Sequence, residues 1–499
     1  MVKAQMKYTP RFQILGALVV PFLMAGCATV NPRPDFDRTN ERVRHALGQG
    51  MAYRPNEEAA LQARVKELLD GGLRPDEAVE VCLLNNPRLW SELLRVGIGR
   101  AEVVQAGLFS NPNLSLSLRW PDGGGLTNLE AGLAQNLADL WQIPHRTRAA
   151  ERELDRLVLE VAREISVVAL GAKTAYFESV SADRQRDIAQ ENLAITQEAL
   201  DLAIAKRDAG SGSDVDVNLA RSRHVEVELR LQKSALTAVE ARAALARLLG
   251  MQVSPSELAL AGELDDRPTS ATTAEHLIDV ARSERLDFKA ARMLVEAAVS
   301  RVALERSRFL RSLELGISTE RAERGSRGDR NWLAETAFES LQAGQLSPPS
   351  LEPREEQSTD WVVGPTLGVE LPIFDQNQAQ IAKAMYEYQQ ALHALDALDR
   401  ELTQQAWVTF ERARIARKNA DYYEQTVLPL RRESLTLATE AYRAGQTPLL
   451  SVLDAQRDLL EARADYIAVL RDHVLAMTEI ERVTGQPLAR LLDDSAREP

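Results

Sequence analysis

The stretch that decides the fold is AKRDAGSGSDVDV at residues 205–217, which returns in altered form as EAYRAGQTPLLSV at residues 440–452. Both belong to a longer gap-free match between residues 198–250 and residues 433–485. The aligned pairs include Leu200 with Leu435, Gly210 with Gly445, Val217 with Val452, Ala220 with Ala455 and Arg247 with Arg482. Identical spacing over such a length indicates that one structural unit has been written twice.

A second match shows how far the duplication extends. Residues 79–118 correspond without a gap to residues 278–317, at an offset of 199 positions, whereas the first match has an offset of 235. The second copy therefore carries about 35 additional residues, which fall within residues 321–360. We predict a first repeat at residues 57–253, a second repeat at residues 254–486 and a C-terminal tail at residues 487–499.

Residues 1–26 predict a signal peptide. Three basic residues precede a largely apolar run at residues 12–26, which is shorter than the roughly 20 apolar residues of a membrane-spanning helix. Cys27 follows Ala-Gly, a sequence that resembles the cleavage box of bacterial lipoproteins, whose cysteine is acylated, for example with palmitate. We expect lipid attachment at Cys27 and a lipid-anchored N-terminal extension at residues 27–56. The alternative is an ordinary signal peptide with an incidental cysteine.

Composition argues against several classes of function. Without the signal peptide the chain has 57 Lys and Arg against 73 Asp and Glu, a net charge of −16, so we expect no nucleic acid partner. The six histidines are scattered without metal-ligand spacing, and the glycine-rich stretch at residues 210–213 lacks the lysine of a phosphate-binding loop. We therefore predict no enzyme, no catalytic residue, no metal and no cofactor.

Cys82 is aligned with Ala281, which predicts that Cys82 is a small, buried, apolar side chain.

Seven-residue spacing of apolar side chains predicts long helices packed side by side. The first copy shows this spacing at Leu154, Val158, Val161, Ile165 and Val168, and the second copy at Ile381, Met385, Tyr388, Leu392 and Leu395. Breakers bound one long helix per repeat, at residues 144–208 and 376–443, each roughly 100 Å long. Glycine-containing turns at residues 209–213 and 444–448 then lead into returning helices, which makes two helical hairpins.

Alternation of apolar and polar residues predicts two short strands upstream of each long helix. The strands are expected at about residues 112–120 and 128–137 in the first repeat, and at about residues 312–320 and 361–371 in the second. Such alternation is typical of membrane β-strands, although a soluble hairpin shows it too. The intervening residues 321–360 predict a long external loop, with a short helix near residues 331–341.

The predicted fold is mainly α with a small β part, and its four strands are too few to close a membrane barrel. Two copies would give eight strands with a filled interior, whereas three copies would give twelve strands and a lumen. A homotrimer is therefore the favoured assembly for a conduit.

The order of these features resembles the TolC family of outer-membrane efflux proteins, especially its lipoprotein members. The segments that carry the resemblance are Asn86-Pro87-Arg88-Leu89, Leu371-Pro372-Ile373-Phe374, Tyr442-Arg443-Ala444-Gly445 and Val452-Leu453-Asp454-Ala455. The resemblance implies a homotrimer with a twelve-stranded barrel in outer-membrane lipid and a helical tunnel in the periplasm. It also implies an entrance that a periplasmic adaptor docks on and opens, with energy from an inner-membrane pump.

The resemblance also assigns roles to residues at the helical tips. Gly210 and Gly445 fall where the adaptor docks, and Tyr442, Asp216 and Asp454 become candidates for the periplasmic gate. This chain departs from the family at Ser451, where an acidic residue is common, and at Thr447, which replaces an arginine of the closing network. The two aspartates have two interpretations, either an acidic constriction in the lumen or solvated residues on a helix face.

Pro429 lies inside the second long helix, about 15 residues before its tip, and is aligned with Ala194. Because proline deletes a helix hydrogen bond, we predict a bend here that the first repeat lacks. The predicted function is that of a passive outer-membrane export channel. The alternative is a periplasmic coiled-coil adaptor or scaffold without a pore, which would not need alternating strands in both repeats.

Overall fold

The computed structural model describes residues 28–50, 58–120, 127–252, 258–264, 273–325, 340–344 and 357–495. The predicted signal peptide, Cys27 and most of the short helix predicted at residues 331–341 lie outside this part. The chain divides into two compact units, and each is described by itself. Unit 1 comprises residues 1–103, 151–297 and 389–499, and unit 2 comprises residues 104–150 and 298–388.

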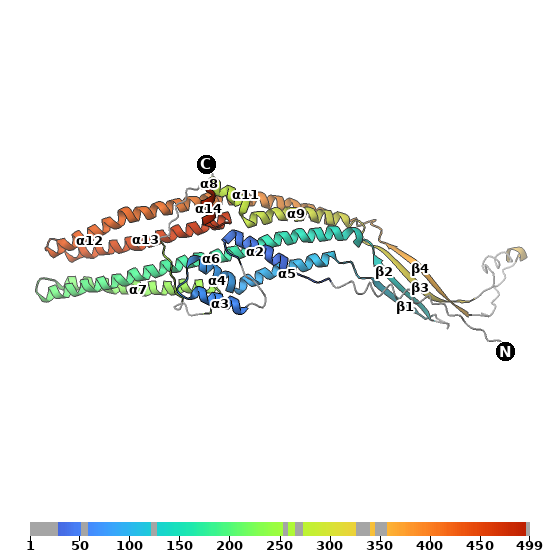
Figure 1. Cartoon of the computed structure of the whole chain (residues 1–499), viewed down its shortest axis with the longest axis horizontal. Helices are drawn as coiled ribbons and strands as arrows, with labels where there is room; N and C mark the ends of the chain where they lie inside the picture. Colours follow the sequence, from blue (N-terminus) through green and yellow to red (C-terminus); the bar gives the residue numbers. More distant parts are fainter. Residues whose placement is uncertain are drawn as a thin grey trace. The chain divides into compact units, whose positions relative to one another are not determined.

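Both repeats contain the same order of helices, which can be followed along the ribbon in Figure 1. The first repeat has α4 (Pro75–Asn85), α5 (Pro87–Gly107), α6 (Asp139–Asp208) and α7 (Asp214–Leu248). The second has α8 (Ala274–Glu284), α9 (Leu286–Ser307), α11 (Gln378–Tyr422), α12 (Leu428–Arg443) and α13 (Leu449–Thr484). A π-helix, η2 (Tyr423–Val427), joins α11 to α12. The remaining helices are α2 (Arg33–Leu47), α3 (Glu58–Leu69) and α14 (Leu488–Ser495).

The first long helix begins earlier than the sequence predicted. Proline is favoured in the first turn, which placed the expected start at Pro144, but α6 begins at Asp139 and contains that proline. The carboxylate of Asp139 accepts hydrogen bonds from the backbone N–H and the hydroxyl of Ser110, at 2.7 and 2.6 Å. A carboxylate in the first turn also interacts favourably with the helix dipole, so the earlier start is stabilised locally.

Each helical tip stops one helix with a glycine and starts the next with a capping residue. Gly210 and Gly445 adopt φ angles of 76° and 71°, which lie in the left-handed region that favours glycine. Ser213 is the N-cap of α7, and Pro448 occupies the same place before α13. The chain therefore reverses within a few residues at both tips.

An apolar core in unit 1 joins helices of the second repeat to the C-terminal helix. Its buried members include Leu277 of α8, Phe288 of α9, Leu402 of α11, Met477 of α13 and Leu491 of α14. The segment at residues 487–499 was predicted only as a tail, but residues 488–495 form α14 and contribute to this core. Leu488 and Leu491 of this short segment pack against a surface that only the folded repeat provides.

A buried carboxylate fixes α2 to the first repeat. Asp35 is 1% exposed and accepts hydrogen bonds from Arg100 at 2.5 and 2.8 Å and from Arg38 at 2.9 Å. Arg38 also donates to Asp155 of α6 at 2.8 Å. Burial raises the pKa of Asp35, but the two arginines outweigh burial and hold that pKa below its usual value of 3.8. Residues 33–47 of the predicted N-terminal extension are therefore packed as a helix.

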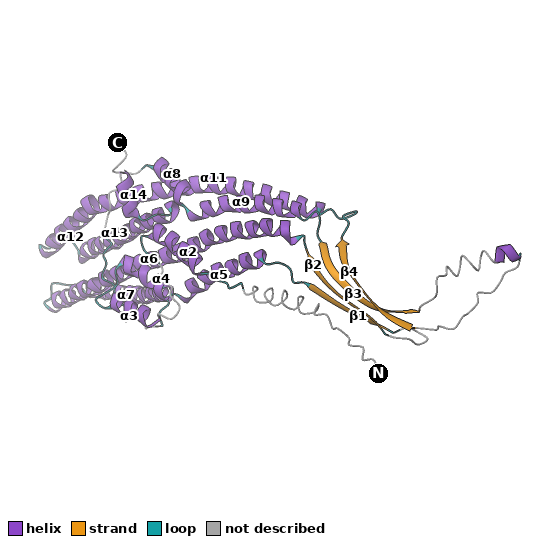
Figure 2. Cartoon of the chain, turned by 45° about the vertical axis from the view of Figure 1, so that its right-hand side comes forward, coloured by secondary structure: helices purple, strands orange, loops and turns teal. Residues whose placement is uncertain are grey.

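Unit 2 contains one antiparallel sheet, drawn in orange in Figure 2, with the strand order β1-β2-β3-β4. The strands are β1 (Asn113–Arg119), β2 (Asn128–Asn136), β3 (Leu313–Gly325) and β4 (Gln357–Val369). The first two come from the first repeat and the other two from the second. Strands β3 and β4 extend beyond the strands predicted at about residues 312–320 and 361–371, because their pairing continues as far as Gly325 with Gln357. Backbone pairing does not require alternating side chains, so the pattern underestimates this hairpin.

Candidate functional site

One face of the sheet is mainly apolar across all four strands, with Gln135, Thr319 and Arg321 as its polar members. Residues that face each other in an antiparallel pair lie on the same side, so the register assigns each side chain to a face. Leu116 pairs with Ala131, Leu133 pairs with Ile317, and Leu315 pairs with Leu367. Further members of this face are Leu114, Leu118, Leu129, Leu313, Val363, Pro365 and Val369. Leu114, Leu116 and Leu367 are 74%, 67% and 68% exposed, so nothing in the part of the chain that the structure describes covers them.

The opposite face of the sheet is mainly polar, although Ala134 and Val362 also lie on it. It carries Ser115, Ser117, Arg119, Asn128, Glu130, Gly132, Glu314, Gly316, Ser318, Glu320, Gly364, Thr366 and Gly368. Arg119 forms an ion pair with Glu130 at 3.1 Å, while Glu130 faces Glu320 in the register. A sheet with one exposed apolar face and one hydrated face suits a lipid-to-water boundary.

Exposed aromatic side chains mark both ends of the apolar face. Trp120 follows β1 and Trp361 lies in β4 opposite Arg321, both at the end of the sheet away from the helices. Phe309 precedes β3 and Phe374 follows β4 at the helical end, and both are exposed. From Trp361 to Val369, where β4 ends, the strand advances roughly 27 Å, or about 21 Å across a membrane at a tilt near 40°. This length is close to the ~25 Å apolar band of outer-membrane barrels.

The two helical tips meet inside unit 1 through an apolar cluster. Its buried members come from α6 and α7 of the first repeat and from the start of α13 of the second, namely Leu200, Ala203, Val217, Ala220, Leu449 and Leu453. Tyr442 of α12 packs against this cluster. The ammonium group of Lys206 lies 3.6 Å from the centroid of the Tyr442 ring, which is a cation–π contact. We name this arrangement of Lys206, Tyr442 and the cluster the tip contact.

The candidate aspartates make their contacts within their own helix ends. Asp216 and Ser213 form a capping box, in which Asp216 donates its backbone N–H to the Ser213 hydroxyl oxygen at 3.1 Å and its carboxylate accepts from the backbone N–H of Ser213 at 3.3 Å. Asp454 is exposed and forms an ion pair with Arg457 at 3.3 Å. Asp216 therefore has a structural role as a helix cap, independent of any role in a lumen.

The region around Pro429 departs from regular α-helix. The π-helix Tyr423–Val427 ends two residues before Pro429, whereas α6 runs without interruption through the aligned Ala194. Proline and π-helical turns are both common causes of helix bending. The two repeats therefore differ in helix geometry at this position. The inward bend itself stays a prediction.

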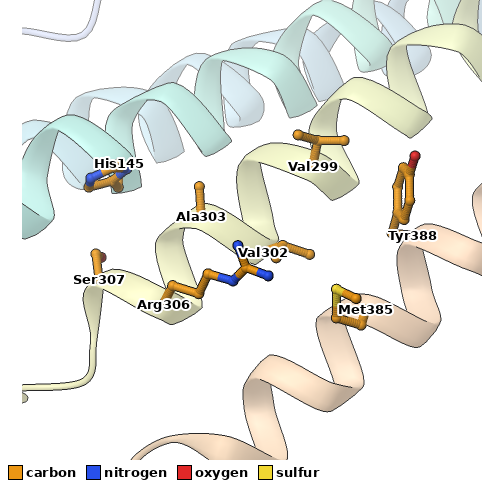
Figure 3. A pocket seen from close by; sticks show the side chains of 8 residues that line it. All are labelled: His145, Val299, Val302, Ala303, Arg306, Ser307, Met385 and Tyr388. Carbon is orange, nitrogen blue, oxygen red and sulfur yellow. The ribbon is translucent and has the colours of Figure 1, made fainter.

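An open groove of ≈ 550 Å³ lies along one face of α9, between the start of α6 and the start of α11 (Figure 3). Its lining includes Val299, Val302 and Arg306 of α9, Met385 and Tyr388 of α11 and His145 of α6. This lining is thus mainly apolar, with positive charge from an arginine. The groove presents both apolar surface and a cationic group to a solute.

Other kinds of site find no support in the described residues. Among those residues, no three His, Cys, Asp or Glu side chains are grouped so that they could hold a metal ion. Nor does any helix in the described ranges have the length and apolar content needed to cross a membrane. Cys82 is buried in α4, as predicted, and burial raises the pKa of its thiol to about 12.

Sequence reasoning missed Lys206 and the π-helix. Lys206 lies in the quoted stretch beside the first tip, but its partner Tyr442 belongs to the other repeat, and no spacing rule connects the two. The offset between the repeats is 234 positions for Ala182 with Ala416 and 235 for Gly210 with Gly445, and this change is the signal that would have revealed the π-helix. The structure brings Tyr442 and the tips together and leaves Asp216 and Asp454 in separate local contacts.

A family model described as "Outer membrane efflux protein" matches residues 78–251 and 277–486. The cobalt-zinc-cadmium resistance protein CzcC of Cupriavidus metallidurans is 26% identical over 341 residues, which cover 68% of this chain and 73% of that protein. The probable efflux pump outer membrane protein TtgC of Pseudomonas putida is 24% identical over 486 residues, which cover 93% of each. The crystal structure of the outer membrane protein VceC of Vibrio cholerae matches with a TM-score of 0.62 and 16% identity, covering 87% of this chain and 100% of that one.

Proposed function

Because this chain belongs to the outer membrane efflux protein family, we propose that three copies of it join their sheets into one barrel and form a passive conduit out of the periplasm. Family membership confirms the predicted role in efflux and the predicted place in the outer membrane. Four strands per chain give twelve strands in a trimer, enough for a barrel with a lumen. In this barrel β1 of one chain would pair with β4 of the next, so that neither strand remains an unpaired edge as it is in a single chain.

The observation that carries this proposal is the amphipathic sheet. Its apolar face would contact lipid, and its polar face would line the lumen. The strand register supports this assignment independently of the comparisons, because it places every leucine and isoleucine of the strands and two of their three described valines on one side and serine, glycine and glutamate on the other. Leaving that apolar face in water would be costly, since burial of apolar area is worth about 25 cal/mol per Å².

We further propose that the helical tips form the periplasmic entrance, on which an adaptor docks near Gly210 and Gly445. The tip contact would hold the second tip against the first at rest, with Tyr442 as the gate residue and Lys206 as its partner. Asp216 and Asp454 remain candidates for an acidic constriction. An inner-membrane pump would supply the energy through the adaptor.

Cys27 is proposed to carry the lipid anchor after removal of the signal peptide, although it lies outside the described residues. The packing of α2 supports this proposal, because the buried ion pairs of Asp35 fix the chain seven positions after Ala28, the first described residue. An anchor attached there would tether the first repeat to the membrane.

Membrane fractionation tests the proposed assembly. The full-length chain should appear in the outer-membrane fraction and migrate on unheated SDS gels as a trimer that heating converts to a monomer. Cys27→Ser should lose palmitate labelling and still form trimers, because the sheet rather than the lipid holds the assembly. A soluble periplasmic monomer would contradict the proposal and favour the scaffold alternative.

A further inference from the structure

A second groove lies within unit 1, between α11 and α13. Its volume is ≈ 610 Å³, which is within the usual range of sites that bind small molecules. Ile415 of α11 and Val469 and Leu475 of α13 contribute apolar lining, and Thr409 and Asn419 of α11 contribute polar groups. The groove therefore offers apolar surface and hydrogen-bonding groups to a molecule of modest size.

The groove lies on the opposite side of α13 from the helices that pack on it. Met477 of α13 is 6% exposed and belongs to the core that includes Leu277 of α8 and Leu491 of α14. Asp472 and Glu479 line the groove, and at 100° per residue they point about 140–160° away from Met477. Short helices that pack on a tunnel wall must lie outside it, because three copies of them inside would obstruct the conduit. In the proposed trimer the groove therefore faces the lumen.

Arg412 supplies the uncompensated charge of the groove. The other charged groups of the lining have partners, since Arg482 is paired with Glu479, and Asp472 is paired with Arg471 at 2.7 Å. Among the residues that the structure describes, Arg412 has no ion-pair partner, and its side chain is exposed. Its guanidinium group is therefore available to an anionic solute.

Further positive charge lies beside the groove, at Arg482. The Arg163 guanidinium donates to the backbone carbonyl of Arg482 at 3.3 Å and lies 3.5 Å from the Asp287 carboxylate. Arg285, which is 5% exposed, pairs with the same carboxylate at 2.8 Å, so one aspartate serves two arginines. Burial lowers the pKa of Arg163, and the charges of Arg285 and Arg482 lower it further, although Asp287 opposes them. Positive charge is thus in excess here, which favours an anion.

We infer that the groove is a lumenal binding site for small organic anions with an apolar body, such as aromatic carboxylates and sulfonates. Arg412 holds the anionic group, because its planar guanidinium can donate two parallel hydrogen bonds to such a group, and the apolar body lies against Val469 and Leu475. The inference rests on the proposed function, since the groove faces a lumen only if three copies form a conduit. It names a class of solute for which the tunnel wall has affinity.

Equilibrium dialysis of radiolabelled 1-naphthalenesulfonate against full-length trimers in lipid nanodiscs tests the site, with empty nanodiscs as the blank. The wild-type protein should bind the probe saturably, at one molecule per chain. Arg412→Gln should weaken binding at least about fivefold, whereas Arg412→Lys, which keeps the charge, should weaken it less. Leu475→Ser should weaken binding at least about threefold, because it removes apolar contact.

The matched control is Arg414→Gln. Arg414 lies two positions further along α11, is exposed and is paired with Glu411 at 2.7 Å, outside the lining of the groove. This substitution removes the same charge and should leave the affinity unchanged. The cation 1-naphthylmethylammonium should bind at least about tenfold more weakly than the sulfonate. Absence of saturable binding, equal affinity in Arg412→Gln and the wild type, or equal affinity for both probes would overturn the proposal.

Single-channel current in planar bilayers separates this inference from the proposed function. 1-Naphthalenesulfonate, at its dissociation constant, should lower the mean current of wild-type trimers and leave that of Arg412→Gln unchanged. Trimers that conduct but neither bind the probe nor are blocked by it would refute the site and leave the conduit standing. Trimers that bind the probe but never conduct would refute the conduit, and with it the lumenal position of the site.

Discussion

Placing a charge on the apolar face of the sheet should destabilise the inserted protein far more than placing it on the polar face. Leu116 lies at the middle of β1, is 67% exposed and pairs with Ala131 on the apolar face. Lysine at the bilayer midplane costs about 2–4 kcal/mol in barrels of this kind, which is roughly 30- to 1,000-fold in the folding equilibrium of one chain. Three chains in an assembly would lose about 6–12 kcal/mol.

The adjacent residue supplies a matched control. Ser117→Lys changes the same strand one position further on, where the side chain lies on the polar face near Glu130. The assay is urea unfolding of liposome-inserted protein, followed by the heat-modifiable band on SDS gels. Leu116→Lys should strongly lower the urea concentration at the unfolding midpoint. Ser117→Lys should change the free energy of unfolding by less than about 1 kcal/mol. Equal shifts for both variants, or a larger shift for Ser117→Lys, would refute the assignment of faces.

Three further predictions concern unit 1. A double-mutant cycle on Lys206→Met and Tyr442→Leu, measured as opening frequency in bilayers, should give a coupling of about 0.5–2 kcal/mol, whereas strict additivity would exclude a cation–π contact. Because folding lowers the pKa of Asp35, its carboxylate stabilises the protein fully above pH 3.8, and this stabilisation is lost as the pH falls through the lower pKa of the folded state. In acid unfolding followed by circular dichroism, the Asp35→Asn variant should lack this part of the pH dependence of stability. The Cys82 thiol, with a pKa near 12, should resist maleimide at pH 8 until urea unfolds the protein, and rapid labelling of native protein would contradict its burial.

The predictable part of the fold is the part encoded by local periodicity. Seven-residue spacing and the glycines at residues 210 and 445 mark the helical hairpins, because helix packing and left-handed turns constrain residue type at fixed intervals. The alternation around Leu116 and Leu367 marks the strands, and the register then places both residues on one apolar face. The mainly helical fold with one short sheet is confirmed.

The rest depends on contacts that no local pattern records. Lys206 meets Tyr442 across two repeats, and Asp35 meets Arg100 at a separation of 65 residues. Helix α14 was missed because its few leucines gain their partners only in the folded core around Leu491. Asp216 was predicted from its place near a tip, yet its capping-box geometry with the residue three positions earlier was readable from the sequence and was overlooked.

The most direct measurement of the central claim is ion conductance by the purified, outer-membrane-extracted protein in a planar lipid bilayer, recorded together with its native mass. The account predicts discrete single-channel steps from a particle with the mass of three chains. A particle of one chain that inserts without conducting, or a trimer that stays in solution and never inserts, would contradict it.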